Sequence, residues 1–288
     1  MSLKSKRLCL SLTTWFSVPD KGMKSLEILN RGSAFIVPNT NRKSIKNQLA
    51  IVSCSHVIAP WKWPAYYPNE WLKHVNESHV SYTLEIRNQN GILDCQFDLS
   101  DKVFHHKYLD VSVLLFRDEE AVSKICNKSG VEALHIDTDD ISIGQKFLLK
   151  GHALTGTIDP DGKDHRYQIP YDANGTLKYK THPEIIFESS ESSEMLQDAG
   201  ENLGVADRII EDGMSGGPVL VPQATPGMNQ RAVVNNIIDS SDDDCPIEVS
   251  REYVCKGMLD ALYLEHRLGS NLVSVISSKD ILSFLNSI

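Results

Sequence analysis

"EDGMSGGPVL", residues 211–220, places one serine, Ser215, among three glycines. Glycine costs backbone entropy in regular structure, so several glycines around one hydroxyl indicate unusual backbone conformations or a close approach of another segment. One reading is a glycine-rich turn between strands in which Ser215 has no special role, because short glycine motifs recur by chance. The other reading is a nucleophile held on a tight, exposed loop.

A serine becomes a nucleophile only when a base takes its proton and a third group orients that base. "VSCSHVI" places His56 directly after an apolar run, and "YLDVSVLLF" places Asp110 at the start of another. The order His56, Asp110, Ser215 is one of three unrelated chain orders that support the same triad geometry.

The segment "GMSGG" also satisfies G-x-S-x-G, the nucleophile elbow of α/β-hydrolases. That fold needs the acid and then the histidine after the serine, and the only such pair is Asp260 and His266. The short remainder of the chain and the lack of βαβ units upstream argue against this alternative.

Short apolar runs separated by turn residues predict an all-β fold. Leu8, Leu10 and Leu12 alternate like a half-buried strand, and residues 80–97 alternate on both sides of Asn90 and Gly91, which is a hairpin signal. The final "SSKDILSFLNSI" predicts a short helix. The pattern favours antiparallel barrels or a sandwich. The remaining predicted strands lie in 32–37, 48–54, 110–116, 143–151, 176–189 and 272–276.

Composition limits the partners. The chain has 288 residues, 41% hydrophobic content and a formal net charge of −9, and its Lys and Arg residues are scattered. Nucleic-acid binding needs clustered cations, so it is not expected. The apolar runs are too short to span a membrane.

Cysteine usage indicates an intracellular protein. The six cysteines are sparse and form no CxxC pair, which favours reduced thiols in the cytoplasm or an organelle and makes secretion the less favoured reading. The start "MSLKSKRLCLSLTTWF" is basic and free of acids until Asp20, which is compatible with a mitochondrial transit peptide, although its alternation favours a strand.

Three segments read as loops: the aromatic 59–71, the polar 188–202 and an insertion at 222–253. "DSSDDDC" within the insertion lacks the Gly and terminal Glu of an EF-hand, so a charged surface loop is expected. His105 and His106 lack acids or cysteines at ligand spacing. No metal or cofactor is predicted.

Taken together, these segments resemble trypsin-like serine proteases of the chymotrypsin fold, closest to the HtrA/Deg branch. The resemblance covers roughly 30–221 and 256–287. "GSAFIV" is similar to the family's GSGFIV strand and "SCSHVI" to its histidine segment. "DRIIEDGMSGGPVL" is similar to its nucleophile loop, and "NLVSVISSKDILSFL" to its last strand and closing helix.

The resemblance implies two antiparallel six-stranded barrels with a short C-terminal helix. Residues 1–125 would carry His56 and Asp110, and residues 126–288 would carry Ser215. It implies a serine endopeptidase that hydrolyses polypeptide substrates through an acyl-enzyme, with Gly213 and Ser215 as oxyanion donors. A homo-oligomer is compatible with it.

Several positions depart from the family. Met214 stands where members carry Asp or Asn, no cysteine follows His56, and the chain ends after the closing helix, so the PDZ module of HtrA is expected to be missing. Ile209 replaces the acid of a basic-specific pocket, so Ile209, Met258 and Asp260 predict a pocket for an apolar or small side chain. The alternative function is a protease-fold binding or chaperone module with a latent or closed site.

Overall fold

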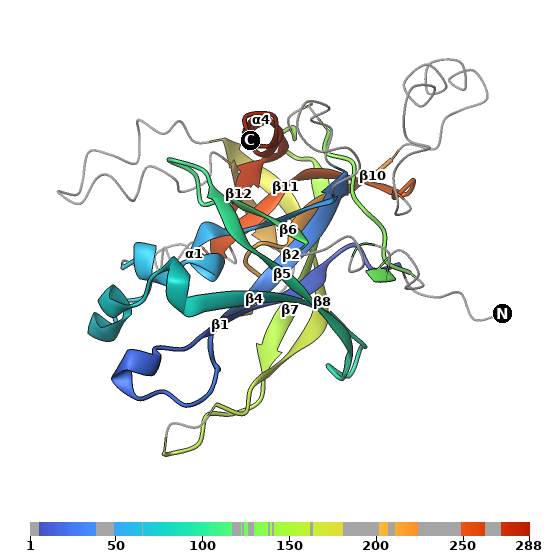
Figure 1. Ribbon diagram of the computed structural model, residues 1–288. Helices are drawn as coiled ribbons and strands as arrows, with labels where there is room; N and C mark the ends of the chain where they lie inside the picture. The colour runs from blue at the N-terminus through green and yellow to red at the C-terminus, as the bar shows by residue number, and fades with distance from the viewer. Residues whose placement is uncertain are drawn as a thin grey trace, which may run out of the picture.

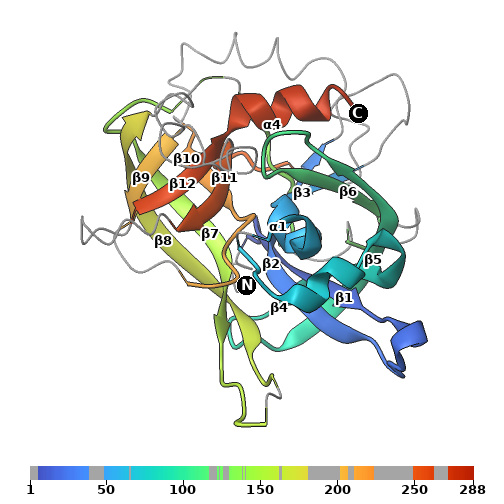
Figure 2. The same ribbon diagram turned by 90° about the vertical axis from the view of Figure 1, so that its left-hand side faces the viewer.

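Strands dominate the computed structural model (Figure 1), in which two closed barrels lie side by side (Figure 2). Each barrel has six antiparallel strands, so the predicted all-β, chymotrypsin-like two-barrel fold is confirmed. The structure describes residues 6–38, 49–64, 66–116, 122, 124–125, 130–137, 139, 141–161, 164–180, 202–206, 211–223, 249–262 and 272–288.

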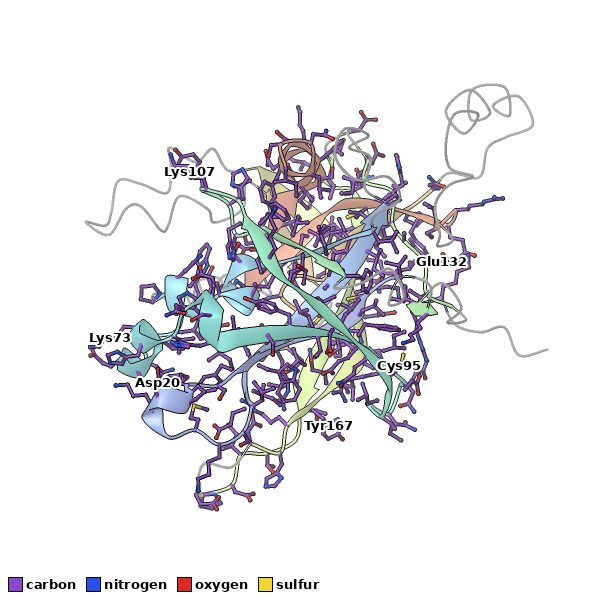
Figure 3. All side chains as sticks on the ribbon, viewed as in Figure 1. Asp20, Lys73, Cys95, Lys107, Glu132 and Tyr167 are labelled. Atoms are coloured by element: carbon purple, nitrogen blue, oxygen red, sulfur yellow. The ribbon has the colours of Figure 1, made fainter. Side chains whose placement is uncertain are left out.

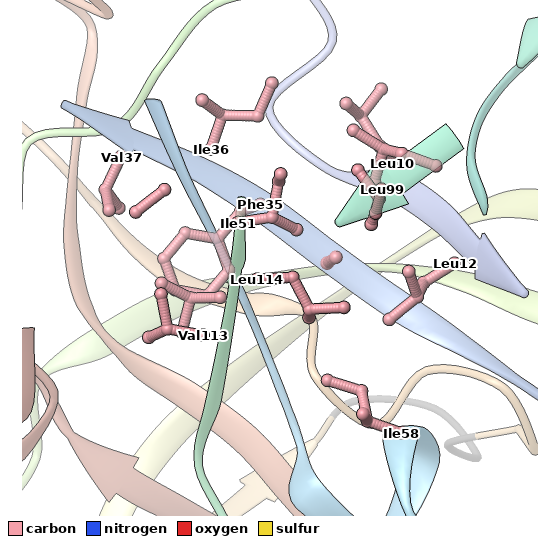
Figure 4. Close-up of a cluster of buried hydrophobic side chains, with 14 of the residues drawn as sticks. Leu10, Leu12, Phe35, Ile36, Val37, Ile51, Ile58, Leu99, Val113 and Leu114 are labelled. Atoms are coloured by element: carbon pink, nitrogen blue, oxygen red, sulfur yellow. The ribbon is translucent and has the colours of Figure 1, made fainter. Parts of the chain in front are cut away.

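The first barrel closes in the strand order β1-β2-β3-β6-β5-β4. Alternating side chains of these strands fill its interior, as Leu10 and Leu12 of the first strand do (Figure 4). The predicted hairpin is present, with Gly91 at φ +77° in its turn. The strands are β1 (Leu10–Phe16), β2 (Glu27–Pro38), β3 (Leu49–Ser53), β4 (Val80–Arg87), β5 (Leu93–His105) and β6 (Ser112–Phe116).

The second barrel closes in the order β10-β11-β12-β9-β8-β7. Its longest strand, β8, begins at Tyr167 and runs through Pro170 and Gly175, well before the predicted start at residue 176. The strands are β7 (Lys146–Thr155), β8 (Tyr167–Lys180), β9 (Asn202–Ala206), β10 (Pro218–Pro222), β11 (Tyr253–Leu262) and β12 (Leu272–Ser277).

One apolar cluster continues from the first barrel across to the second, where it includes Met258 and Ile276. The closing helix α4 (Ser278–Leu285) lies above both barrels (Figure 2). Ser277 caps it by accepting a hydrogen bond from the Asp280 amide at 3.2 Å. Its Phe284 ring meets the His106 ring of the first barrel at 5.1 Å, so α4 joins the two barrels.

Short helical turns cover the first barrel where the site forms. They are η1 (Pro19–Lys21), α1 (Ser55–Ile58), η2 (Pro60–Lys62), η3 (Glu70–His74) and η4 (Glu77–His79). Charged side chains such as those of Asp20, Lys73 and Lys107 lie at the periphery (Figure 3). Among the described helices, none has the length and apolar character needed to cross a membrane.

Parts of the sequence predictions lie outside the described residues. These parts include Ile209, most of the 188–202 segment and most of the insertion at 222–253. The boundary between 125 and 126 falls between the last strand of the first barrel and the first strand of the second. It stays a prediction, because residues 126–129 are not described.

Candidate active site

The loop around Ser215 needs its glycines because other backbone approaches it closely. Gly213 has φ +91°, and a Cβ there would lie 2.7 Å from the His152 carbonyl oxygen. Gly216 has φ +88°, and its Cβ would lie 2.2 Å from the Ser33 carbonyl oxygen. Any side chain at either position would combine backbone strain with a backbone clash. The glycines therefore seat the loop tightly between the barrels.

Ser33 of β2 holds this loop against the first barrel. Its amide donates to the carbonyl of Ser215 at 2.8 Å, and its hydroxyl donates to the carbonyl of Gly213 at 2.8 Å. The hydroxyl also accepts from the amide of His152 at 2.9 Å. The sequence analysis assigned Ser33 only to a strand. Its place directly after Gly32 in "GSAFIV" was the available signal, because a polar residue there interrupts an apolar strand.

The backbone amides of this loop differ in their hydrogen bonding. Met214, Gly216 and Gly217 donate their amides to backbone carbonyls. No described residue accepts from the amides of Gly213 or Ser215. Among the described residues, both amides are therefore without an acceptor, and Ser33 bonds to the carbonyls of the same two residues.

His56 and Asp110 form a buried hydrogen-bonded pair. The Nδ1 atom of His56 bonds to Oδ2 of Asp110, and the His56 amide donates to Oδ1 at 2.8 Å. The side chains are 5% and 1% exposed, so water does not compete for these bonds. Burial by itself raises the pKa of Asp110, but the charge and hydrogen bonds of His56, with a hydrogen bond from Asp260, hold that pKa below its ordinary value.

His56 sits in α1, directly after β3, and Asp110 precedes β6. These two strands pair in the barrel, with Ser53 opposite Ser112. The strand pairing thus brings the two residues together although they are far apart in the chain. Ser55 supports the arrangement, since its amide donates to the Asp110 carbonyl at 3.3 Å and its hydroxyl contacts that of Ser112 at 2.6 Å.

Ser215 and His56 line one cavity of about 550 Å³ between the barrels. Gly213 lines it as well, so the predicted nucleophile, base and oxyanion donor face the same space. Five charged residues also line this cavity, namely Arg31, Asp164, Arg166, Glu211 and Asp212.

Tyr66 stacks on His56 with ring centroids 4.9 Å apart and an interplanar angle of 2°. It belongs to the aromatic segment 59–71, which the sequence analysis interpreted as a loop. Trp61 and Tyr67 of this segment pack against the apolar cluster, whereas Tyr66 covers the histidine. Burial raises the pKa of the Tyr66 hydroxyl above its ordinary value, so it stays neutral.

Two of the predicted pocket residues, Met258 and Asp260, do not line this cavity. Met258 and Asp260 are 0% and 1% exposed. Their neighbour Leu259 lines the cavity instead. The pocket assignment stays a prediction, since Ile209 is not described.

Met214, the departure beside the nucleophile, is a core residue. Its side chain is fully buried in the apolar cluster of the second barrel. A Cβ on Gly151 would lie 2.9 Å from Met214 Cγ, so the glycine makes room for the methionine. Methionine therefore occupies this position as an apolar anchor of the loop.

Four buried groups, Cys54, His56, Asp110 and Asp260, have donor atoms within 4.8 Å of one another. These atoms already bond within the protein. His56 bonds to Asp110, the Cys54 thiol donates to the Leu259 carbonyl at 3.3 Å, and Ser274 donates to Asp260. The cluster is a hydrogen-bonded network of the candidate site. His105 and His106 bond separately, to Ser112 and to loop amides.

We expect the folded protein to lose stability in acid through His152, behind the nucleophile loop. Burial, with smaller effects from Arg87 and other cations, lowers the pKa of His152 to about 3. The unfolded chain takes up this proton below about pH 6.5, but the folded protein does not. Stability is therefore complete above that pH and falls as the pH falls, by about 2 kcal/mol at pH 5.

Urea unfolding at pH 8 and pH 5 measures this loss. His152→Asn should lose about 2 kcal/mol less than wild type over that interval. His135→Asn, which removes an exposed histidine, should behave as wild type. Equal losses in wild type and His152→Asn would contradict the prediction.

Comparisons with known proteins give a fold likeness only. No family model matches the sequence, and no curated protein matches it. Among solved structures, the chain is similar to Rv3671c from Mycobacterium tuberculosis H37Rv, in the inactive form of a serine-to-alanine mutant. The identity is 10%, the TM-score is 0.47, and the match covers 96% of this chain and 85% of that chain. The two-barrel fold is established by the strand topology, and the roles of the residues rest on their own geometry.

Proposed function

We propose that the protein is a serine endopeptidase with Ser215 as nucleophile, His56 as base and Asp110 as the group that orients the base. One observation carries the proposal: His56, which bonds to the buried Asp110, lines the same cavity between the barrels as Ser215. A serine, a histidine or an aspartate alone is common near strand ends. Their convergence from two barrels is what the triad chemistry requires.

In the proposed reaction, Ser215 Oγ attacks the scissile carbonyl while His56 takes the hydroxyl proton. Asp110 holds Nδ1 of His56, which leaves Nε2 to serve the serine. The amides of Gly213 and Ser215 stabilise the tetrahedral oxyanion, and each such donor contributes about 3–4 kcal/mol in related chemistry. His56 then gives its proton to the leaving amine, and water hydrolyses the acyl-enzyme.

Polypeptides are the proposed substrates. On the side of β10, the described residues pair with β11 as far as Leu259, which bonds to Gly216 and Gly217, while β12 continues on the other side to Leu262. An extended peptide can add to the β11 edge beyond Leu259 through main-chain hydrogen bonds. The same proposal has two finer parts. The protein is proposed to belong with the HtrA/Deg branch, and its substrate pocket is proposed to be formed by Ile209, Met258 and Asp260.

The second candidate is a binding or chaperone module with a closed site. The observation that favours it is the 4% exposure of His56 beneath the stacked Tyr66 ring. In such a protein the triad is assembled but substrate does not reach the histidine until Tyr66 moves.

A fluorophosphonate probe tests the proposal, because it labels only an activated serine. We expect labelling of wild type, none of Ser215→Ala, and normal labelling of Ser142→Ala, which removes an exposed serine. Digestion of a peptide library by unlabelled wild-type protein would then report its cleavage preference. Labelling of Tyr66→Ala but not of wild type would favour the closed module. Labelling of neither folded protein would overturn the assignment of Ser215.

A further inference from the structure

A glutamine side chain, that of Gln168 near the start of β8, is buried where the second barrel meets the first. The residue is 0% exposed. It faces inward because side chains alternate along a strand, and its neighbour Tyr167 is exposed. A buried amide is costly unless both of its ends form hydrogen bonds, so its partners decide what it does there. The proposed reaction gives this side chain no role.

Both ends of the Gln168 side chain bond to the first barrel. Oε1 accepts from the Ser11 hydroxyl of β1 at 2.6 Å, and Nε2 donates to the Gly32 carbonyl of β2 at 2.8 Å. A carbonyl oxygen can only accept, so the NH₂ end must face Gly32. Ser11 also lies 3.4 Å from a Glu85 oxygen. Its one proton belongs in the shorter contact, where two oxygens would otherwise repel, so the amide has one orientation.

The Gly32 carbonyl belongs to a peptide unit that also bonds to the nucleophile loop. The N–H at the other end of this unit, that of Ser33, donates to the Ser215 carbonyl at 2.8 Å. The described residues contain no cis peptide bond, so the C=O and the N–H of this planar unit point in opposite directions. Gln168 therefore bonds to one end of a rigid plane whose other end bonds to Ser215.

The bond from Gln168 fixes this plane relative to the barrel that carries the nucleophile. Gly32 lies opposite Leu12 of β1, so strand pairing fixes the plane relative to the first barrel. A carbonyl oxygen has two lone pairs, so it can also accept from Gln168. Gln168 is in the second barrel, and the loop of Ser215 leads into β10 of the same barrel. The plane is thus held from both sides of the site.

The Gln168 amide and the Gly32–Ser33 plane lie close to the loop. A Cβ on Gly213 would be 3.6 Å from Nε2 of Gln168, and a Cβ on Gly32 would be 3.1 Å from the Ser215 carbonyl oxygen. The plane and the backbone of Ser215 are therefore in contact. A rotation of the plane would move that backbone.

We propose that Gln168 is a positioning residue that acts through the Gly32–Ser33 peptide on the backbone of Ser215. This inference rests on the proposed function. Hydrogen bonds in a chain polarise one another, so the bond from Gln168 strengthens the bond that Ser33 donates to Ser215. The chain from Ser11 through Gln168 and this peptide holds the hydroxyl and the amide of Ser215 where they serve attack and oxyanion binding.

Two variants separate the bond to Gly32 from the rest of the chain of bonds. Ser11→Ala removes the bond to Oε1 and leaves the bond to Gly32, whereas Gln168→Met removes both and keeps an unbranched side chain of similar length. Gln168→Met should lower kcat about tenfold with KM within about twofold of wild type, the loss expected for one hydrogen bond. Ser11→Ala should keep kcat within about threefold of wild type. Gln96→Met, at an exposed glutamine, should leave both constants unchanged.

A transition-state analogue distinguishes positioning from a merely structural role. A peptide aldehyde forms a tetrahedral adduct with the serine, so its affinity depends on the oxyanion amides, whereas the corresponding peptide alcohol binds only as a ground state does. In Gln168→Met the inhibition constant of the aldehyde should rise about tenfold, in parallel with the loss of kcat, and that of the alcohol should not change. Wild-type kcat and aldehyde affinity in folded Gln168→Met, or equal losses in Ser11→Ala and Gln168→Met, would overturn the proposal.

Hydrogen exchange provides a readout that does not depend on activity. The Ser33 amide should exchange about tenfold faster in Gln168→Met than in wild type, because its bond to Ser215 is weakened. The Ser250 amide, which donates to the Ala133 carbonyl at 2.9 Å, should exchange at the wild-type rate.

Unchanged exchange at Ser33 in the folded variant would contradict the proposal. Faster exchange at Ser33 in a protein whose wild type is folded but not labelled by a fluorophosphonate would refute the proposed function, while the contact of Gln168 with the loop would stand. Gln168→Leu, which also lacks the amide, is the alternative where Gln168→Met does not fold, and the same outcomes apply to it.

Discussion

Replacing His56 with alanine should lower kcat by about 10⁶-fold, the largest effect we expect from one side chain. His56 is the one described imidazole that lines the cavity with Ser215, so no other histidine is placed to take the serine proton. Binding and the oxyanion amides remain, so KM should change little and some catalysis over water should persist.

Steady-state kinetics on a peptide substrate measure this loss, with circular dichroism to confirm folding. His74→Ala, which removes an exposed histidine of η3, is the matched control and should keep wild-type kcat. A folded His56→Ala within tenfold of wild type would remove His56 from the role of base.

Asp110→Asn should lower kcat by about 10⁴-fold without disturbing the fold. The His56 amide donates to Oδ1 of Asp110 at 2.8 Å, so the oxygen of the new amide takes that place. Its NH₂ then faces Nδ1 of His56 in place of Oδ2. A donor at this point forces the hydrogen of the imidazole onto Nε2, where it can no longer accept the serine proton.

Turnover and the thermal midpoint should be measured together for this variant, with Asp172→Asn as its control. Asn is similar in size to Asp and keeps the bond to the His56 amide. The thermal midpoint of Asp110→Asn should therefore stay close to that of wild type. Near-wild-type turnover of folded Asp110→Asn would show that another group orients the base.

The secondary structure was readable where short-range patterns decide it. The alternation of Leu10 and Leu12 predicted a strand that the barrel confirms. Asn90 and Gly91 predicted a turn because Gly adopts positive φ without strain, and Gly91 does so. Ser277 predicted the start of a helix, since its hydroxyl caps an amide three residues on.

Short-range sequence patterns missed residues 167–175, the first part of β8. Pro170 and Gly175 are strand breakers in isolation, so the sequence analysis began this strand at residue 176. In the barrel, Pro170 lies opposite His152 and Gly175 opposite Phe147. A Cβ on Gly175 would lie 2.1 Å from the Phe147 ring. The glycine therefore serves packing across the strand pair, which no local pattern reveals.

The triad candidates came from chain order and strand context, and the structure places His56 and Ser215 on one cavity with Asp110 bonded to His56. The roles of Ser33 and Tyr66 had no comparable signal. Ser33 contacts Gly213 across 180 positions of the chain, and the importance of such a contact depends on how the two barrels dock.

By itself, the sequence determined the all-β character, the hairpin turn, the closing helix and the glycine-lined loop of Ser215, because these depend on backbone preferences within a few residues. Only the tertiary structure decided that Tyr66 covers His56 and that Gln168 bonds to Gly32. Both depend on the packing of segments distant in the chain. The physical reason is that a buried polar group is stabilised by the partners that surround it in space, and for Gln168 those partners come from the other barrel.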